Sequence, residues 1–73
     1  MDLAQVGENK KAVIKKLKNK NNIFLRRVEA MGLKVGEEVK VERKLGRNMV
    51  VSTEGRKIAI DRDLAKNIEV EPK

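Results

Sequence analysis

Residues 38–60 have the sequence EVKVERKLGRNMVVSTEGRKIAI. Apolar and polar residues alternate through much of it, and alternation with a period of two is typical of half-buried β-strands. Gly46 lies in a tight reversal after the first alternating run. Glu54-Gly55 is a two-residue link of the kind that needs positive φ. The stretch therefore predicts a meander of three antiparallel strands, at residues 38–43, 48–53 and 56–60.

Working outward, a further strand is predicted on each side of this meander. Residues 11–17 mix basic and aliphatic side chains, and residues 67–71 alternate until Pro72 ends the run. Asp61 is placed to cap a single helical turn before the last strand. Residues 34–37, which include Gly36, form a turn into the strand at 38.

Residues 23–31 are predicted to form a helix with Asn22 as its N-cap. Gly32 then follows the helix end in a left-handed conformation that costs glycine little, and Leu33 packs on Val28 as in a Schellman ending. The apolar residues recur at i, i+4 and i+7 and share one face. These residues are Phe24, Val28 and Met31.

The order of elements predicts a mainly β fold. We expect residues 1–73 to form one domain, an SH3-like barrel of about five strands. The short helix between strands one and two plugs one end of the barrel, and closing the sheet removes its edges. The turns that define the fold are at Gly32, Gly36, Gly46 and Gly55.

The formal net charge of +7 is concentrated in one segment. Residues 9–27 carry eight basic side chains and no acidic one. One interpretation is a patch for an anionic partner, such as nucleic acid, phospholipid headgroups or an acidic protein surface. The other is a solvated face that aids solubility. The candidate partner-binding residues are Lys10, Lys11, Lys15, Lys16, Lys18, Lys20, Arg26 and Arg27.

The composition argues against an enzyme. The chain has no His and no Cys, so it has neither the usual general base nor a thiolate nucleophile. The remaining nucleophile candidates are Ser52 and Thr53, with Lys as the only plausible activator. We therefore expect no catalytic residue.

No cofactor or metal site is predicted either, because iron(II) and zinc prefer imidazole or thiolate ligands. Two carboxylate pairs could hold a hard cation weakly, or could simply be a solvated strand start and a helix N-cap. These pairs are Glu37-Glu38 and Asp61/Asp63. The longest uncharged apolar run is three residues, so no membrane span is expected and the predicted location is cytoplasmic.

The order Met31-Gly32-Leu33, then Gly36, then an alternating strand resembles the FeoA family of bacterial and archaeal ferrous iron uptake. The resemblance covers essentially the whole chain, although the loop at 44–48 is shorter than is usual in the family. Further positions that fit the pattern are Leu3, Gly7-Glu8, Ile14, Leu17, Val50-Val51, Gly55, Lys57-Ile58-Ala59-Ile60, Asp61, Arg62, Asp63, Ala65 and Ile68-Glu69-Val70.

The resemblance implies an SH3-like fold and a partner, the membrane iron transporter FeoB with its cytosolic GTPase domain. The implied role is that of an adaptor or modulator, with at most peripheral contact to the membrane. Some FeoA-like domains are described as metal-binding. Other FeoA-like domains occur at the C-terminus of metal-dependent repressors, but no helix-turn-helix precedes the pattern here.

An alternative function is nucleic-acid binding. Residues 31–39 also resemble the turn of AbrB-type DNA-binding transcription factors, and the basic segment would supply phosphate contacts. Against this, those proteins dimerise through interleaved hairpins, and Phe24 is the only aromatic side chain that could stack on a base. We therefore expect no sequence-specific nucleic-acid binding.

Overall fold

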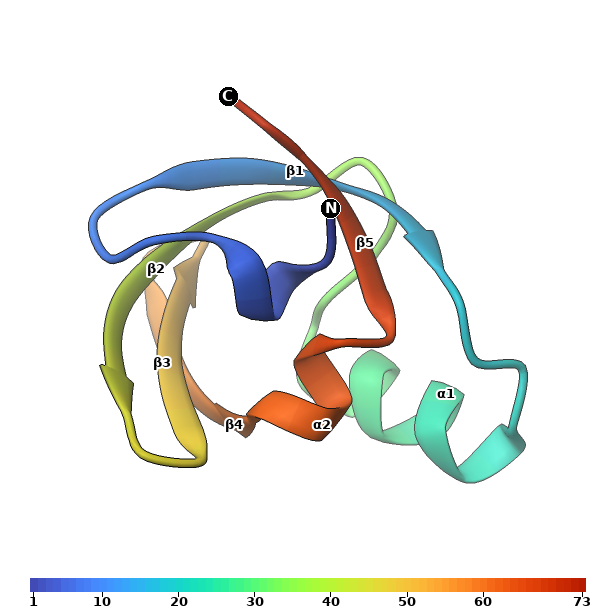
Figure 1. Ribbon diagram of the computed structural model, residues 1–73. Helices are drawn as coiled ribbons and strands as arrows, with labels where there is room; N and C mark the ends of the chain where they lie inside the picture. Colours follow the sequence, from blue (N-terminus) through green and yellow to red (C-terminus); the bar gives the residue numbers. More distant parts are fainter.

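The computed structural model describes residues 1–73. Five strands form one curved antiparallel sheet in the order β4-β3-β2-β1-β5 (Figure 1). The predicted strands, the helix between the first two and the helical turn before the last are confirmed. In chain order the elements are η1 (Leu3–Gln5), β1 (Lys11–Leu17), α1 (Asn22–Ala30), β2 (Glu38–Leu45), β3 (Asn48–Thr53), β4 (Arg56–Asp61), α2 (Arg62–Ala65) and β5 (Ile68–Pro72).

The predicted boundaries differ from the observed ones at a few strand ends. β2 continues to Leu45, two residues beyond the prediction, and β5 begins at Ile68 rather than one residue earlier. Pro72 is the last residue of β5, paired with Ala12, so it lies inside the strand that it was expected to end. The short 3-10 helix η1 was not predicted.

The start of α1 corrects one prediction. The side chain of Asn21, not Asn22, is the N-cap, and its Oδ1 accepts a hydrogen bond of 2.8 Å from the Ile23 N–H. The predicted Schellman ending is confirmed, because the Leu33 N–H donates to the Val28 carbonyl (3.1 Å) and the Gly32 N–H to that of Glu29 (2.9 Å).

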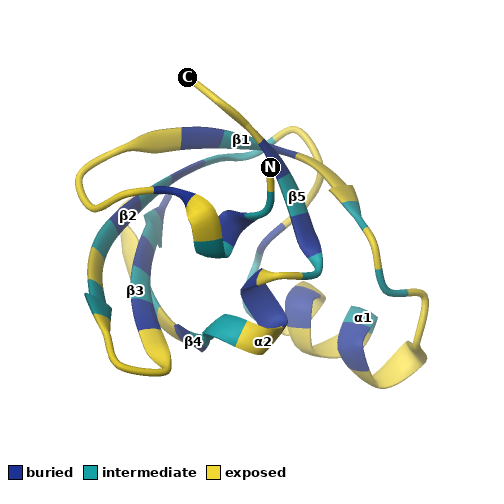
Figure 2. Cartoon of the chain, in the orientation of Figure 1, coloured by how far each residue is buried: buried dark blue, intermediate teal, exposed yellow.

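The core lies on the concave side of the sheet, where buried positions of the strands meet η1, α1 and α2 (Figure 2). Along β2, Val39 and Val41 point inward as predicted. In β4, Ile60 is buried and Ile58 only partly so. The sixteen buried core residues are Leu3, Val6, Ala12, Ile14, Phe24, Val28, Leu33, Val39, Val41, Met49, Val51, Ile60, Leu64, Ala65, Ile68 and Val70.

Two register shifts interrupt the alternation. In β1, Ile14 pairs with Val70 but Lys16 pairs with Glu69, which leaves Lys15 as an extra residue. A similar shift follows Val41 in β2. Bulges of this kind bend a strand and increase its twist, which lets a short sheet curl around a small core.

The sheet is not closed by hydrogen bonds, contrary to the prediction. β4 and β5 are its two edge strands and do not pair with each other. The outer edge of β5 instead meets the start of the chain, where Asp2 bridges to Glu69 and the Val70 N–H donates to the Met1 carbonyl (2.8 Å). The helices α1 and α2 lie at one end of the sheet (Figure 1).

The four glycines expected in turns all have positive φ, at +78° for Gly32, +94° for Gly36, +59° for Gly46 and +77° for Gly55. The residue before Gly55, Glu54, also has positive φ (50°), as a two-residue hairpin link of this type requires.

Candidate interaction surfaces

We call the eight basic residues of segment 9–27 the basic face. All eight side chains are exposed. Three of them lie on β1, two on α1 and the others in the flanking loops. Since a strand rises about 3.3 Å per residue, the stretch from Lys11 to Lys16 in β1 alone spreads these charges over roughly 17 Å. The basic face is therefore an extended band. Its members are Lys10, Lys11, Lys15, Lys16, Lys18, Lys20, Arg26 and Arg27.

Acidic residues from distant parts of the sequence offset some of this charge. Lys15 Nζ lies 3.3 Å from a carboxylate oxygen of Glu71 in β5, and Arg27 Nη2 lies 3.4 Å from one of Asp61. The pairing of β1 with β5 also places Glu69 opposite Lys16. The other six members form no ion pair, and they hold the uncompensated charge of the basic face.

A second set of lysines was missed by the sequence analysis. The strand register places Lys11 opposite Lys40, Lys40 opposite Ser52 and Ser52 opposite Lys57. Three lysines thus lie in one row across four strands, and none of them forms an ion pair. Like charges directly opposite each other are destabilising. The alternation in β2 and β4 predicted that Lys40 and Lys57 face outward. Only the strand register shows that these lysines lie in one row with Lys11.

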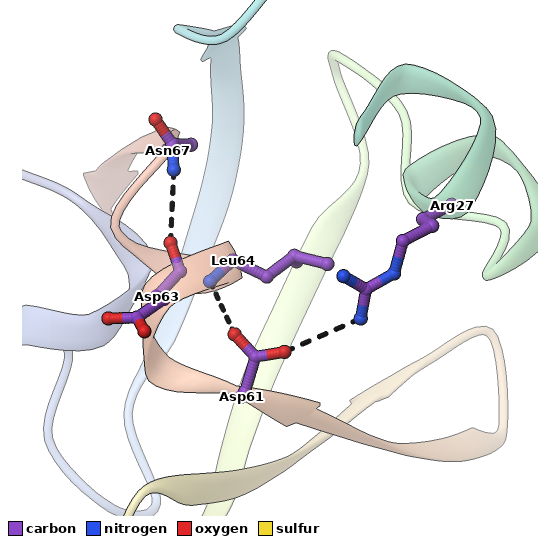
Figure 3. A network of polar contacts seen from close by, with 5 residues as sticks. All are labelled: Arg27, Asp61, Asp63, Leu64 and Asn67. Atoms are coloured by element: carbon purple, nitrogen blue, oxygen red, sulfur yellow. Dashed lines mark hydrogen bonds and ion pairs between the residues drawn. The ribbon is translucent and has the colours of Figure 1, made fainter. Parts of the chain in front are cut away.

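Asp61 is the centre of a polar network between β4, α2 and α1 (Figure 3). One carboxylate oxygen accepts from the Leu64 N–H (2.7 Å), which confirms the predicted cap, and the other accepts from Arg27 (3.4 Å). The hydrogen bond from Leu64 and then the contact with Arg27 lower the pKa of Asp61. The carboxylate therefore stays ionised and acts as a cap.

The other candidate carboxylates also bind cations of this chain. Glu38 pairs with Lys73, and this hydrogen bond lowers the pKa of Glu38. Glu37 lies 3.8 Å from Lys34, and Asp63 lies 3.9 Å from Lys66. The structure contains no group of three or more His, Cys, Asp or Glu side chains that could hold a metal ion.

The two hydroxyl candidates are engaged in structural hydrogen bonds. Ser52 Oγ donates to Glu42 (2.6 Å), and Thr53 Oγ1 donates to the Glu38 carbonyl (3.1 Å). The bond from Ser52 lowers the pKa of Glu42, which makes this carboxylate a weaker base. Neither hydroxyl contacts a group able to remove its proton near neutral pH.

An apolar hollow of about 570 Å³ lies where the end of β1 meets α1 and the loop that follows it. Leu17, Leu25 and Leu33 line it together with Val35, a residue that is 59% exposed. Leu17 and Leu25 belong to the same segment that carries the basic face, so apolar and cationic surfaces are adjacent here.

A comparison with protein-family models matches residues 1–72 to the FeoA domain. The chain belongs to the FeoA domain family. The basic face, the lysine row and the apolar hollow are thus surfaces of a FeoA domain, and the predicted resemblance is confirmed. A search by sequence among curated proteins found no match.

Solved structures share this fold. Iron(II) transport protein A from Clostridium thermocellum is 27% identical over 99% of this FeoA-domain chain and 45% of its own, with a TM-score of 0.91. Stenotrophomonas maltophilia FeoA complexed with zinc is 25% identical (97% and 89% covered, TM-score 0.83) and is described as a prokaryotic SH3 domain protein. The predicted SH3-like fold is therefore confirmed.

The same fold also occurs as part of a longer protein. The IdeR protein of T. acidophilum is 23% identical, and the alignment covers all of this chain but 34% of that one, with a TM-score of 0.91. This likeness shows the fold alone. Family membership associates the FeoA-domain chain with ferrous iron transport. The longest helix, α1, has nine residues, and none is long and apolar enough to cross a membrane.

Proposed function

We propose that this chain is a non-enzymatic, cytoplasmic adaptor of ferrous iron uptake, acting as one FeoA domain by contact with a FeoB-like transporter that carries a GTPase domain. The observation that carries the proposal is the FeoA match over residues 1–72. The description of the S. maltophilia protein, which proposes a ferrous iron transport activating factor, supports it.

The basic face and the adjoining apolar hollow form the proposed contact surface. Protein interfaces combine an apolar centre with a polar, charged rim. Leu17 and Leu25 supply the apolar part, while the exposed Lys16, Lys18 and Arg26 form no ion pair within the chain. A partner with acidic residues around an apolar anchor would complement both parts, and its association would be accelerated by the opposite charge.

The proposal is tested by titrating this chain against the purified cytosolic domain of the transporter at low and roughly physiological salt, while GTP hydrolysis is followed in parallel. We expect saturable 1:1 binding that weakens as salt screens the basic face. Absence of binding at both salt concentrations, up to about 100 μM of each protein, would refute an adaptor role through this domain.

Nucleic-acid binding is the second candidate, and the row of Lys11, Lys40 and Lys57 favours it because three unpaired cations lie on one face of the sheet. Phosphate contacts alone give weak binding that falls steeply with salt. A titration with duplex DNA and with single-stranded RNA distinguishes the candidates. Nanomolar affinity for one defined sequence at physiological salt would replace the adaptor proposal.

A further inference from the structure

A second hollow, lined mainly by polar and charged residues, opens between the β2–β3 turn and α2. Its volume is about 730 Å³, and no hydrophobic side chain lines it. Three cationic side chains border it, one from the turn and two from the α2 region, together with two carboxylates. The cations are Arg47, Arg62 and Lys66, and the carboxylates are Asp61 and Asp63.

The backbone fixes the two arginines beside each other. The Arg62 N–H donates to the Arg47 carbonyl at 2.8 Å, and Asn48 pairs with Asp61 at the adjacent rung of the sheet. The β2–β3 turn is therefore held against the start of α2, and residues that are fifteen positions apart in the sequence border the same hollow.

The charges around the hollow do not cancel. Asp61 gives one oxygen to the Leu64 N–H and the other to Arg27, which lies outside the hollow (Figure 3). Asp63 lies 3.9 Å from Lys66. The side chains of Arg47 and Arg62 form no hydrogen bond or ion pair within the chain, and Nε of Arg62 is buried without an acceptor. Two guanidinium groups therefore lack a counter-charge.

We propose that this hollow is a binding site for a small oxyanion, a phosphate or pyrophosphate group, held by Arg47 and Arg62. A guanidinium presents its N–H donors in a planar fork that matches the oxygens of phosphate in pairs. A bound phosphate would supply a counter-charge to both guanidinium groups, which border the hollow. No hydrophobic side chain lines the hollow on which a nucleotide base could pack, so the phosphate group itself is what it recognises.

The test uses the full chain labelled with ¹⁵N and follows its amide resonances by NMR. Sodium phosphate and sodium pyrophosphate are titrated separately near pH 7, with sodium chloride at matched ionic strength as the reference. We expect saturable shifts centred on Arg47, Asn48 and Arg62 with both phosphates and not with chloride. A GDP titration measures whether a base adds to the affinity.

Variants then assign the contact. Because a hydrogen bond to a charged group contributes more than a neutral one, Arg47→Gln and Arg62→Gln should each weaken binding by about tenfold to a hundredfold. Arg62→Lys keeps the charge without the fork and should also bind more weakly. Arg43→Gln removes an exposed arginine on β2, outside both the hollow and the basic face, and should bind as the unmodified chain does.

Several results would overturn the site. Shifts that chloride reproduces, or an equal loss of affinity in Arg43→Gln, would show screening of the net charge. Binding that persists when both arginines are replaced would place the anion elsewhere. GDP affinity more than tenfold above that of pyrophosphate would contradict recognition of the phosphate group alone. Thermal unfolding of each variant verifies that it is folded. If Arg62→Gln is unfolded, Arg47→Gln, which lies in an exposed turn, tests the site in its place.

Discussion

The guanidinium of Arg56, at the start of β4, lies against the α-carbon of Gly32, in the space that a β-carbon there would occupy. Its Nη1 donates to the Met31 carbonyl at 3.4 Å, close to the end of α1. A cation at this end of a helix interacts favourably with the unpaired carbonyls. The hairpin between β3 and β4 thereby contacts the C-terminal end of α1.

Gly32→Ala should lower the free energy of unfolding by about 1 kcal/mol or more, because φ of +78° strains any residue with a β-carbon and Arg56 must also move. Chemical denaturation measures this change. Gly7→Ala is the matched control, since a β-carbon at Gly7 would meet only Lys10 Cγ, at 3.6 Å. Equal effects of the two substitutions would contradict this account.

Removing the Asp61 cap should destabilise the protein. We expect Asp61→Ala to cost about 1–2 kcal/mol, as is typical for the loss of an N-cap, and Asp61→Asn to cost less because an amide oxygen can still accept from Leu64. Asp63→Ala is the control, because its side chain is 95% exposed and caps nothing. Denaturation curves at neutral pH would refute the cap if both alanine variants were equally stable.

Acid should weaken the fold through the same carboxylate. The pKa of Asp61 is lower in the folded chain than in the unfolded one, so its stabilising effect is complete above the unfolded pKa and is lost as the pH falls through the folded pKa. Glu38 and Glu42 act in the same direction. The thermal unfolding temperature should therefore fall less steeply between about pH 6 and pH 2 for Asp61→Asn than for the unmodified chain. The lower limit lies roughly two pH units below the usual pKa of Asp. Parallel curves for the two proteins would exclude this contribution.

Charge reversal tests the basic face. Lys18→Glu with Arg26→Glu should leave the fold intact, slow association with the transporter domain and reduce its salt dependence, because both side chains are exposed and unpaired. Lys15, Lys16 and Arg27 are avoided, since reversing their charge would place like charges beside acidic partners. These partners are Glu71, Glu69 and Asp61.

The matched control for that experiment is Arg43→Glu with Lys57→Glu, which changes the net charge by the same amount at exposed positions outside the basic face. Binding kinetics at two salt concentrations compare the two pairs. Equal effects would attribute the result to net charge, and no effect of either pair would identify the basic face as a solvated surface only.

Calorimetric titration with Fe(II) or Zn(II) should reveal no site tighter than micromolar. The chain lacks imidazole and thiolate ligands, and its candidate carboxylates are held by Lys73, Lys34, Lys66 and the Leu64 amide. A stoichiometric submicromolar site would contradict this prediction and would call for a search among variants of Glu37, Glu38, Asp61 and Asp63.

The local features of the fold could be predicted because they depend on neighbouring residues. The alternation of Val39 and Val41 gives β2, and Gly32 after Val28 gives the helix ending. The N-cap was placed one residue late because Asn21 and Asn22 are equally good caps, and only the backbone shows which side chain reaches Ile23.

Features that depend on register could not be predicted. The ion pairs of Lys15 with Glu71 and of Arg27 with Asp61 join residues that are 56 and 34 positions apart. A charge count along the sequence therefore omitted acidic side chains that lie beside the basic segment in space. The row through Lys11 and Lys40 likewise requires knowledge of which residues lie opposite each other.

The bulge at Lys15 has a consequence for changes in chain length. With Lys15 deleted, Ile14 would still pair with Val70, Lys16 with Glu69 and Leu17 with Ile68, now in uninterrupted alternation. A deletion at any regularly paired residue of a strand instead turns the following side chains to the opposite face. Lys15 therefore marks a place in β1 where a descendant sequence could lose one codon and keep its buried side chains buried, with a flatter strand as the result.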